Sequence, residues 1–197
     1  ASPLASLLRP ELADLTGYVP AHPAGIRVRL DANESPPPAS AALREAIARA
    51  VQSVPLERYP DSLFVEDVAL AFTGAAILLN PGAPTRRGEA AEIAPMLEQQ
   101  FPRVLRLAEG SVDGGDVLVT PRGVFIGVSA RTTPQGARSL VSLLNKLGMH
   151  GRAVSTPKGV LHLKSDCSLL DEETVFCTPR LAASEVFEGF RVVLTPP

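Results

Sequence analysis

The stretch Val112-Asp113-Gly114-Gly115-Asp116-Val117 combines two carboxylates, a pair of glycines and the start of an apolar run. Glycine lets the backbone adopt positive φ angles or approach a ligand closely, and it leaves room beside neighbouring side chains. Asp116 opens a hairpin pattern, in which apolar runs at 117–120 and 124–128 flank a turn at Pro121-Arg122-Gly123. The stretch therefore predicts a β-hairpin led by an aspartate, with Asp113 placed to meet a cationic group.

The same unit occurs three times along the chain. Asp67 opens the apolar runs 68–72 and 75–79, and Asp166 opens the runs 167–170 and 174–177. The leading aspartates are thus 49 and 50 residues apart, and such a period is typical of propellers and solenoids. Helices are predicted over 89–101 and after the N-cap Thr133, and a last strand over 191–194. Each repeat should be a hairpin, a loop, a helix and a strand; chance similarity between hairpins is the alternative.

Composition limits the class of protein. The chain has 197 residues, 45% of them hydrophobic, and a net charge of −2. It is long enough to bury a core, and it has no excess of positive charge for nucleic acid or a membrane surface. The longest apolar run, 68–79, is too short to span a bilayer, and Ala1-Ser2-Pro3 does not begin a signal peptide. We expect a soluble cytoplasmic protein with no nucleic-acid or membrane partner.

The two cysteines, Cys167 and Cys177, should face each other across the third hairpin. A cross-strand disulfide is one outcome, but such bridges are usually strained, and two buried free thiols suit a cytosolic chain better. No second Cys/His pair accompanies them, so no metal site is expected.

Residues 1–60 resemble the N-terminus of histidinol-phosphate aminotransferases. A strand is predicted over 26–30, and a helix carries Leu43, Ile47 and Val51 on one face. The resemblance implies pyridoxal-phosphate chemistry, but no lysine stands in the setting of that family's cofactor-binding lysine. An aminotransferase fragment is therefore the weakest alternative, and no cofactor is expected. The matching residues are Arg9-Pro10-Glu11-Leu12, Leu15, Tyr18-Val19-Pro20, Leu30-Asp31-Ala32-Asn33-Glu34-Ser35-Pro36 and Arg58-Tyr59-Pro60-Asp61.

From residue 57 onward the chain resembles a different family. Five motifs occur in order: 57–67, 81–89, the Asp113 stretch, 127–132 and Leu161-His162-Leu163-Lys164-Ser165. They are similar to those of dimethylarginine dimethylaminohydrolases. The resemblance implies the pentein fold, an α/β propeller of five modules, of which this chain would hold about three. We therefore predict two parts, an aminotransferase-like segment (1–60) and a partial pentein domain (61–197).

The resemblance also implies a site. Asp67 and Asp113, which is a glutamate in some relatives, would grip a guanidinium, and His162 would act as general acid and base. Arginines would clamp the α-carboxylate of the substrate, and two acidic residues would contact its α-amino end. From the residues alone, plainer interpretations exist: turn aspartates, a core histidine and solvated surface charges. The clamp residues are Arg86 and Arg131, and the acidic residues are Asp61 and Glu66.

The implied reaction converts a methylated arginine to citrulline and a methylamine through a cysteine adduct, without metal or organic cofactor. The family's nucleophile would lie beyond residue 197, and neither Cys167 nor Cys177 matches its motif. We therefore expect this chain to be inactive alone. A non-catalytic module that binds arginine analogues, or a fusion relic, is the alternative. The expected partners are a small molecule, arginine or methylarginine, and a second copy of the chain through open sheet edges.

Overall fold

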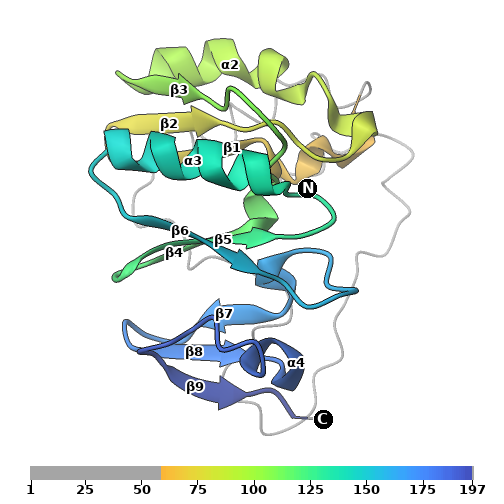
Figure 1. Cartoon of the computed structure of the whole chain (residues 1–197). Coiled ribbons are helices and arrows are strands. Elements are labelled where there is room, and N and C mark those ends of the chain that lie inside the picture. Colours follow the sequence, from red (N-terminus) through yellow and green to blue (C-terminus); the bar gives the residue numbers. More distant parts are fainter. Residues whose placement is uncertain (1–58, 197) are drawn as a thin grey trace, which may run out of the picture. The chain divides into compact units, whose positions relative to one another are not determined.

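The computed structural model describes residues 59–196 (Figure 1). The predicted strand at 26–30 and the helix with Leu43, Ile47 and Val51 lie outside the described residues. The aminotransferase-like character of residues 1–60 and the boundary at residue 60 therefore stay predictions.

Within the described residues, three small sheets follow one another in sequence, each with three strands. In every sheet the first two strands are antiparallel, and the third pairs parallel with the second. The strands are β1 (Ala69–Phe72), β2 (Ala75–Leu78) and β3 (Val104–Arg106); β4 (Val117–Thr120), β5 (Gly123–Val128) and β6 (Gly151–Ser155); and β7 (Cys167–Leu169), β8 (Thr174–Cys177) and β9 (Arg191–Leu194).

A helix connects the second and third strands of each sheet: α2 (Glu89–Gln100), α3 (Pro134–Lys146) and α4 (Pro179–Ala182). A parallel strand needs such a crossover because a tight turn can only reverse the chain. The predicted α/β fold with a repeated hairpin, helix and strand is thus confirmed. Cys167 lies opposite Cys177 in the antiparallel pair of β7 and β8, as expected, and both are free thiols. Closure of the modules around a common axis stays a prediction.

Helix α3 packs between the first two sheets (Figure 1). Side chains of a strand alternate between its two faces, so Ile77 packs on the α3 side while Ala76 and Leu78 pack against α2. In β5, Phe125 instead faces the third sheet, with which it shares a core. The core between the first two sheets includes Ile77, Leu79, Val124, Ile126, Leu140 and Leu144.

A short 3-10 turn precedes each hairpin, which the sequence patterns did not predict. These turns are η5 (Val65–Asp67), η7 (Gly114–Asp116) and η8 (Leu163–Ser165), and two more are η4 (Pro60–Leu63) and η6 (Pro84–Arg86). The leading aspartate of one module bonds the turn of the next: Asp67 Oδ1 accepts from Gly115 N, and Asp116 Oδ1 accepts from Leu163 N. The turns therefore bring the polar residues of three modules together.

Within residues 59–196, no helix is long and apolar enough to cross a membrane.

Candidate active site

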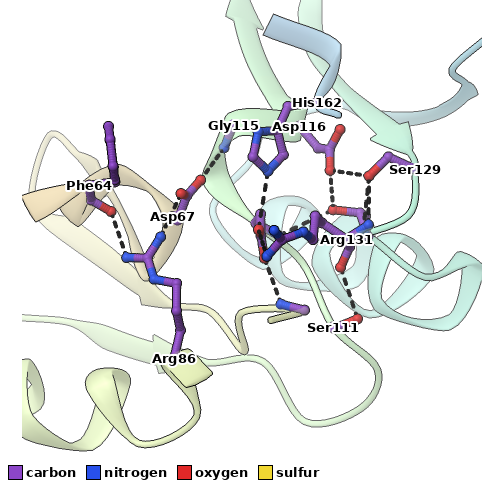
Figure 2. Close-up of polar contacts among 12 residues, drawn as sticks. Phe64, Asp67, Arg86, Ser111, Gly115, Asp116, Ser129, Arg131 and His162 are labelled. Carbon is purple, nitrogen blue, oxygen red and sulfur yellow. Dashed lines mark hydrogen bonds and ion pairs between the residues drawn. The ribbon is translucent and has the colours of Figure 1, made fainter. Parts of the chain in front are cut away.

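Asp67, Asp113 and His162 converge, one from each module. Figure 2 shows Asp67 and His162 within this group of polar contacts. Their nearest polar atoms all lie within 4.8 Å of one another, and His162 Nε2 is 3.1 Å from Asp113 Oδ2. The side chain of Asp113 is 1% exposed and that of His162 is 16% exposed. The structure thus brings together the three residues for which the sequence predicted a shared ligand.

Both carboxylates are held by the protein. Asp113 Oδ1 accepts a hydrogen bond from Gly82 N at 2.6 Å. Asp67 Oδ1 accepts from Gly115 N at 2.9 Å, and its Oδ2 accepts from Arg86 Nη1 at 2.7 Å. Because a carboxylate oxygen has two lone pairs, each of these atoms can still accept from a ligand. The cluster is therefore fixed in position before any ligand binds.

The two glycines of the central stretch leave the room that this cluster needs. A Cβ atom on Gly115 would lie 2.8 Å from His162 Cγ, and one on Gly114 would lie 1.7 Å from the Glu66 carbonyl oxygen. Neither distance is compatible with a side chain. The Gly-Gly pair therefore lets the turns of the modules approach each other and lets His162 reach Asp113.

His162 has a raised pKa. The main cause is its hydrogen bond to Asp113; burial opposes the shift, and the negative charges of Asp116 and Asp67 support it. The protonated imidazole is thus favoured, as suits a group that gives a proton to a departing amine.

Arg86 lies in a different setting from the predicted clamp on a substrate carboxylate. It is 3% exposed, and all of its guanidinium nitrogens have partners in the protein. Nε and Nη2 donate to the Glu89 carboxylate, Nη1 donates to Asp67, and Nη2 also donates to the Phe64 carbonyl. Burial lowers the pKa of Arg86, but its bonds to Glu89 and Asp67 outweigh this and raise it. The guanidinium therefore holds Asp67 and donates four of its five N–H groups to the protein.

The other predicted binding residues lie at the edge of the cluster. The Arg131 side chain is 34% exposed, with Nη1 4.0 Å from Asp113 Oδ2. Glu66 is exposed and pairs with Lys164 Nζ at 2.6 Å, which joins the first and third modules. Asp61 is exposed in the turn η4. Arg131 thus contacts the cluster, whereas Glu66 and Asp61 lie on more open surface.

Two buried acids were missed as site residues by the sequence analysis. Glu89, which is 1% exposed, starts α2 and binds Arg86. Asp116 was predicted only to open a hairpin, yet it is fully buried and accepts three hydrogen bonds. For Asp116 the sequence did contain a signal, because an aspartate recurs at the same place in all three modules. No local pattern distinguished Glu89 from a surface residue of a helix.

Asp67, Asp113 and His162 are also spaced closely enough to share a metal ion. However, Arg86 contacts Asp67 at 2.7 Å, and Arg131 lies 4.0 Å from Asp113. A metal ion also needs a neutral imidazole as its ligand, whereas the hydrogen bond to Asp113 raises the pKa of His162. An organic cation with N–H donors therefore fits the cluster better.

Known proteins resemble this chain in sequence. The sequence model of the arginine deiminase family matches residues 22–193, a range that begins within the segment compared above with aminotransferases. The N(G),N(G)-dimethylarginine dimethylaminohydrolase of Pseudomonas aeruginosa is 37% identical over 144 residues, covering 72% of this chain and 56% of the relative. That of Streptomyces coelicolor is 37% identical over 122 residues, covering 61% and 47%. This chain therefore spans about half the length of these relatives.

Solved structures of related proteins are also similar to this chain. A mutant of the Pseudomonas aeruginosa enzyme complexed with citrulline has a TM-score of 0.67 and 34% identity, covering 79% of this chain and 64% of that chain. A cyanobacterial arginine dihydrolase, ArgZ, shares the fold at 16% identity, with a TM-score of 0.63 over 77% of this chain and 28% of that one. This chain belongs to the arginine deiminase family, and within it is similar to the dimethylarginine dimethylaminohydrolases.

Proposed function

We propose that this chain is the guanidinium-binding part of an amidinohydrolase of the dimethylarginine dimethylaminohydrolase type. The observation that carries the proposal is the convergence of two buried carboxylates and an imidazole, within 4.8 Å, from three modules. A methylated arginine would be converted to citrulline and a methylamine.

Each residue has a role that follows from its setting. A guanidinium is a planar cation with several N–H donors, and Asp67 and Asp113 offer acceptors that are already oriented by Gly115, Arg86 and Gly82. His162, whose pKa is raised by Asp113, donates its proton to the leaving amine and later takes one from water. These carboxylates also hold the central carbon in place for attack.

The attacking group is not one of the two cysteines of this chain. Both are buried, in the third sheet. Burial raises the pKa of Cys167 to about 12 and raises that of Cys177, whereas only a thiolate attacks. We therefore assign the covalent step to a nucleophile outside these 197 residues. The 197-residue chain should then bind substrate without releasing citrulline.

The remaining contacts concern the amino-acid end of the substrate. Arg131 is the predicted clamp whose guanidinium is partly exposed and beside the cluster, so we assign the α-carboxylate to it. Arg86 instead positions Asp67. Glu66 and Asp61 stay candidates for the α-amino end, because both are exposed acids of the first module.

A binding module without catalysis is the second candidate function, and the burial of both thiols favours it. Such a module would use the same cluster to hold arginine or an analogue. The two functions differ in one respect that can be measured: only the enzyme gains citrulline release when a chain that supplies a thiolate is added.

Binding and turnover can be tested separately. Calorimetry of the 197-residue chain with dimethylarginine should show binding that weakens by about 10-fold or more in Asp67→Asn and in Asp113→Asn, because a charged hydrogen bond contributes about 1.5–3 kcal/mol. The control is Asp171→Asn, which changes an exposed aspartate in the third hairpin. Equal affinity in Asp113→Asn and the control would reject the site. Citrulline release by the 197-residue chain alone would reject the external nucleophile.

A further inference from the structure

Asp116 is a buried carboxylate with three partners from two separate segments. It is 0% exposed. Its Oδ2 accepts from Ser129 Oγ at 2.6 Å and from Thr132 Oγ1 at 2.7 Å, and its Oδ1 accepts from Leu163 N at 2.8 Å. Figure 2 shows Asp116 on the opposite side of His162 from Asp67. Its side chain therefore joins the loop after β5 to the turn of the third module.

Each partner of Asp116 leads to a different residue in the cluster or at its edge. Thr132 Oγ1 accepts from Asp113 N at 3.2 Å. Ser129 Oγ accepts from Arg131 N at 3.0 Å. Leu163 follows His162 directly in the chain. The Asp116 carboxylate is thus linked to the backbone of Asp113 and of Arg131 through one hydroxyl group each. It is linked to His162 through the peptide bond between His162 and Leu163.

The direction of these hydrogen bonds requires an acceptor at position 116. A hydroxyl group has a single proton. Because Ser129 Oγ and Thr132 Oγ1 both accept from backbone N–H groups, their own protons are free to point at Asp116. Leu163 contributes a third donor. An ionised carboxylate accepts all three, whereas the amide of asparagine would direct N–H protons at one side of the network.

We propose that Asp116 is a positioning residue, which acts through Thr132, Ser129 and Leu163 to set the placement of Asp113, Arg131 and His162. This inference rests on the proposed function for its effect on ligand binding, but its geometric part concerns only the distance between Asp113 and His162. Loss of a relay hydroxyl should let the Asp113 backbone move and lengthen that contact.

The third module provides a matched comparison. Asp166 occupies the position equivalent to Asp116 and is also buried, and it likewise accepts from a threonine, Thr178 Oγ1 at 2.7 Å. Its other partner is Arg180 of the same module. The pair Asp166 and Thr178 therefore has similar local chemistry without a link to the cluster.

The test uses Thr132→Val, because this change removes the relay hydroxyl and leaves the Asp116 side chain in place. Burial raises the pKa of Asp116 and its hydrogen bonds to Ser129 and Thr132 lower it, so the Asp116 carboxyl is titrated in the same experiment. Two readouts are taken on the full 197-residue chain: the pKa of His162 from an NMR titration, and the affinity for dimethylarginine. His162→Gln identifies the His162 signal among the three histidines. Asp67 and Asp113 are the other ionisable groups that face His162, and both are unchanged in this variant.

Thr132→Val should lower the pKa of His162 toward its ordinary value and weaken dimethylarginine binding about 10-fold. Thr132→Ser, which retains the hydroxyl, should keep the wild-type values of both. Thr178→Val should leave both unchanged while lowering the urea midpoint of unfolding. Ser129→Ala is the second relay variant and should shift both readouts in the same direction as Thr132→Val.

The titration decides the inference by itself. If Thr132→Val and Ser129→Ala both match Thr178→Val in the pKa of His162, Asp116 does not position the cluster. If the wild-type chain binds no dimethylarginine, the proposed function fails, while a shifted His162 pKa in Thr132→Val still supports the positioning role.

Discussion

Replacing Arg86 with methionine should be among the most destabilising single changes in the described part of this chain. The guanidinium donates four hydrogen bonds, to Glu89 twice, to Asp67 and to the Phe64 carbonyl. The side chains of this ion-pair network are almost inaccessible, at 4% for Arg86, 10% for Asp67 and 1% for Glu89. Without Arg86, two carboxylates lose their compensating charge in a site that water barely reaches.

The magnitude follows from that burial. Removing one partner of a buried ion pair costs about 3–5 kcal/mol, and two stranded carboxylates place Arg86→Met near the upper end. Since a domain is typically stable by about 5–15 kcal/mol, the variant should lose a large share of its stability. The second change Glu89→Gln removes one of the stranded charges. The double variant should therefore be more stable than Arg86→Met alone, a coupling that a double-mutant cycle measures.

Urea unfolding of the full chain near neutral pH, followed by circular dichroism, gives these free energies. The matched control is Arg106→Met, which breaks an ion pair to Glu98 whose side chains are more than half exposed and should cost at most about 1 kcal/mol. Equal losses in Arg86→Met and Arg106→Met would refute the reasoning. A double variant that is less stable than Arg86→Met would show that Glu89 does more than balance Arg86.

Three further outcomes are expected. The hydrogen bond to Asp113 raises the folded-state pKa of His162. The contribution of His162 to stability is therefore fully present below about pH 6.5 and is lost as the pH rises through the folded-state value. The difference in unfolding free energy between wild type and His162→Gln should be larger near pH 6 than near pH 9, and a constant difference would contradict this. Gly115→Ala, whose new Cβ would lie 2.8 Å from His162 Cγ, should cost about 1–3 kcal/mol in urea unfolding, and an unchanged midpoint would show that the turn can yield. Cys167 and Cys177 should resist a thiol reagent at about pH 8 until urea is added, since burial raises the pKa of both; rapid reaction of the native protein would disprove this.

Short-range patterns predicted most of the secondary structure. The strands β4, β8 and β9 begin and end at the predicted residues, and α3 starts at Pro134 after the cap Thr133, whose side chain accepts from Gly136 N. These elements depend on alternation and capping, which involve neighbours in sequence. The 3-10 turns carry no comparable signal, because one turn of three residues shows no periodicity.

The predicted meeting of Asp67, Asp113 and His162 came from a family resemblance, since residues that are 46 and 49 positions apart in sequence can lie anywhere relative to one another. The repeat placed them in equivalent parts of three modules but could not supply a distance. The 3.1 Å contact between His162 and Asp113 exists because Gly114 and Gly115 let the turns meet.

By itself, the sequence determined a repeated hairpin, helix and strand unit and the chemical types of the residues at the start of each hairpin. Only the tertiary structure decided which charges are buried. Arg86 and Arg87 are neighbours of the same type, yet one lies in the core against Asp67 and Glu89 and the other is exposed. Asp116 and Asp166 share a sequence context, yet only Asp116 connects to the cluster. The physical reason is that a buried charge finds partners that are distant in sequence, as Asp67 is from Arg86 and Leu163 is from Asp116. Only tertiary packing brings such partners together.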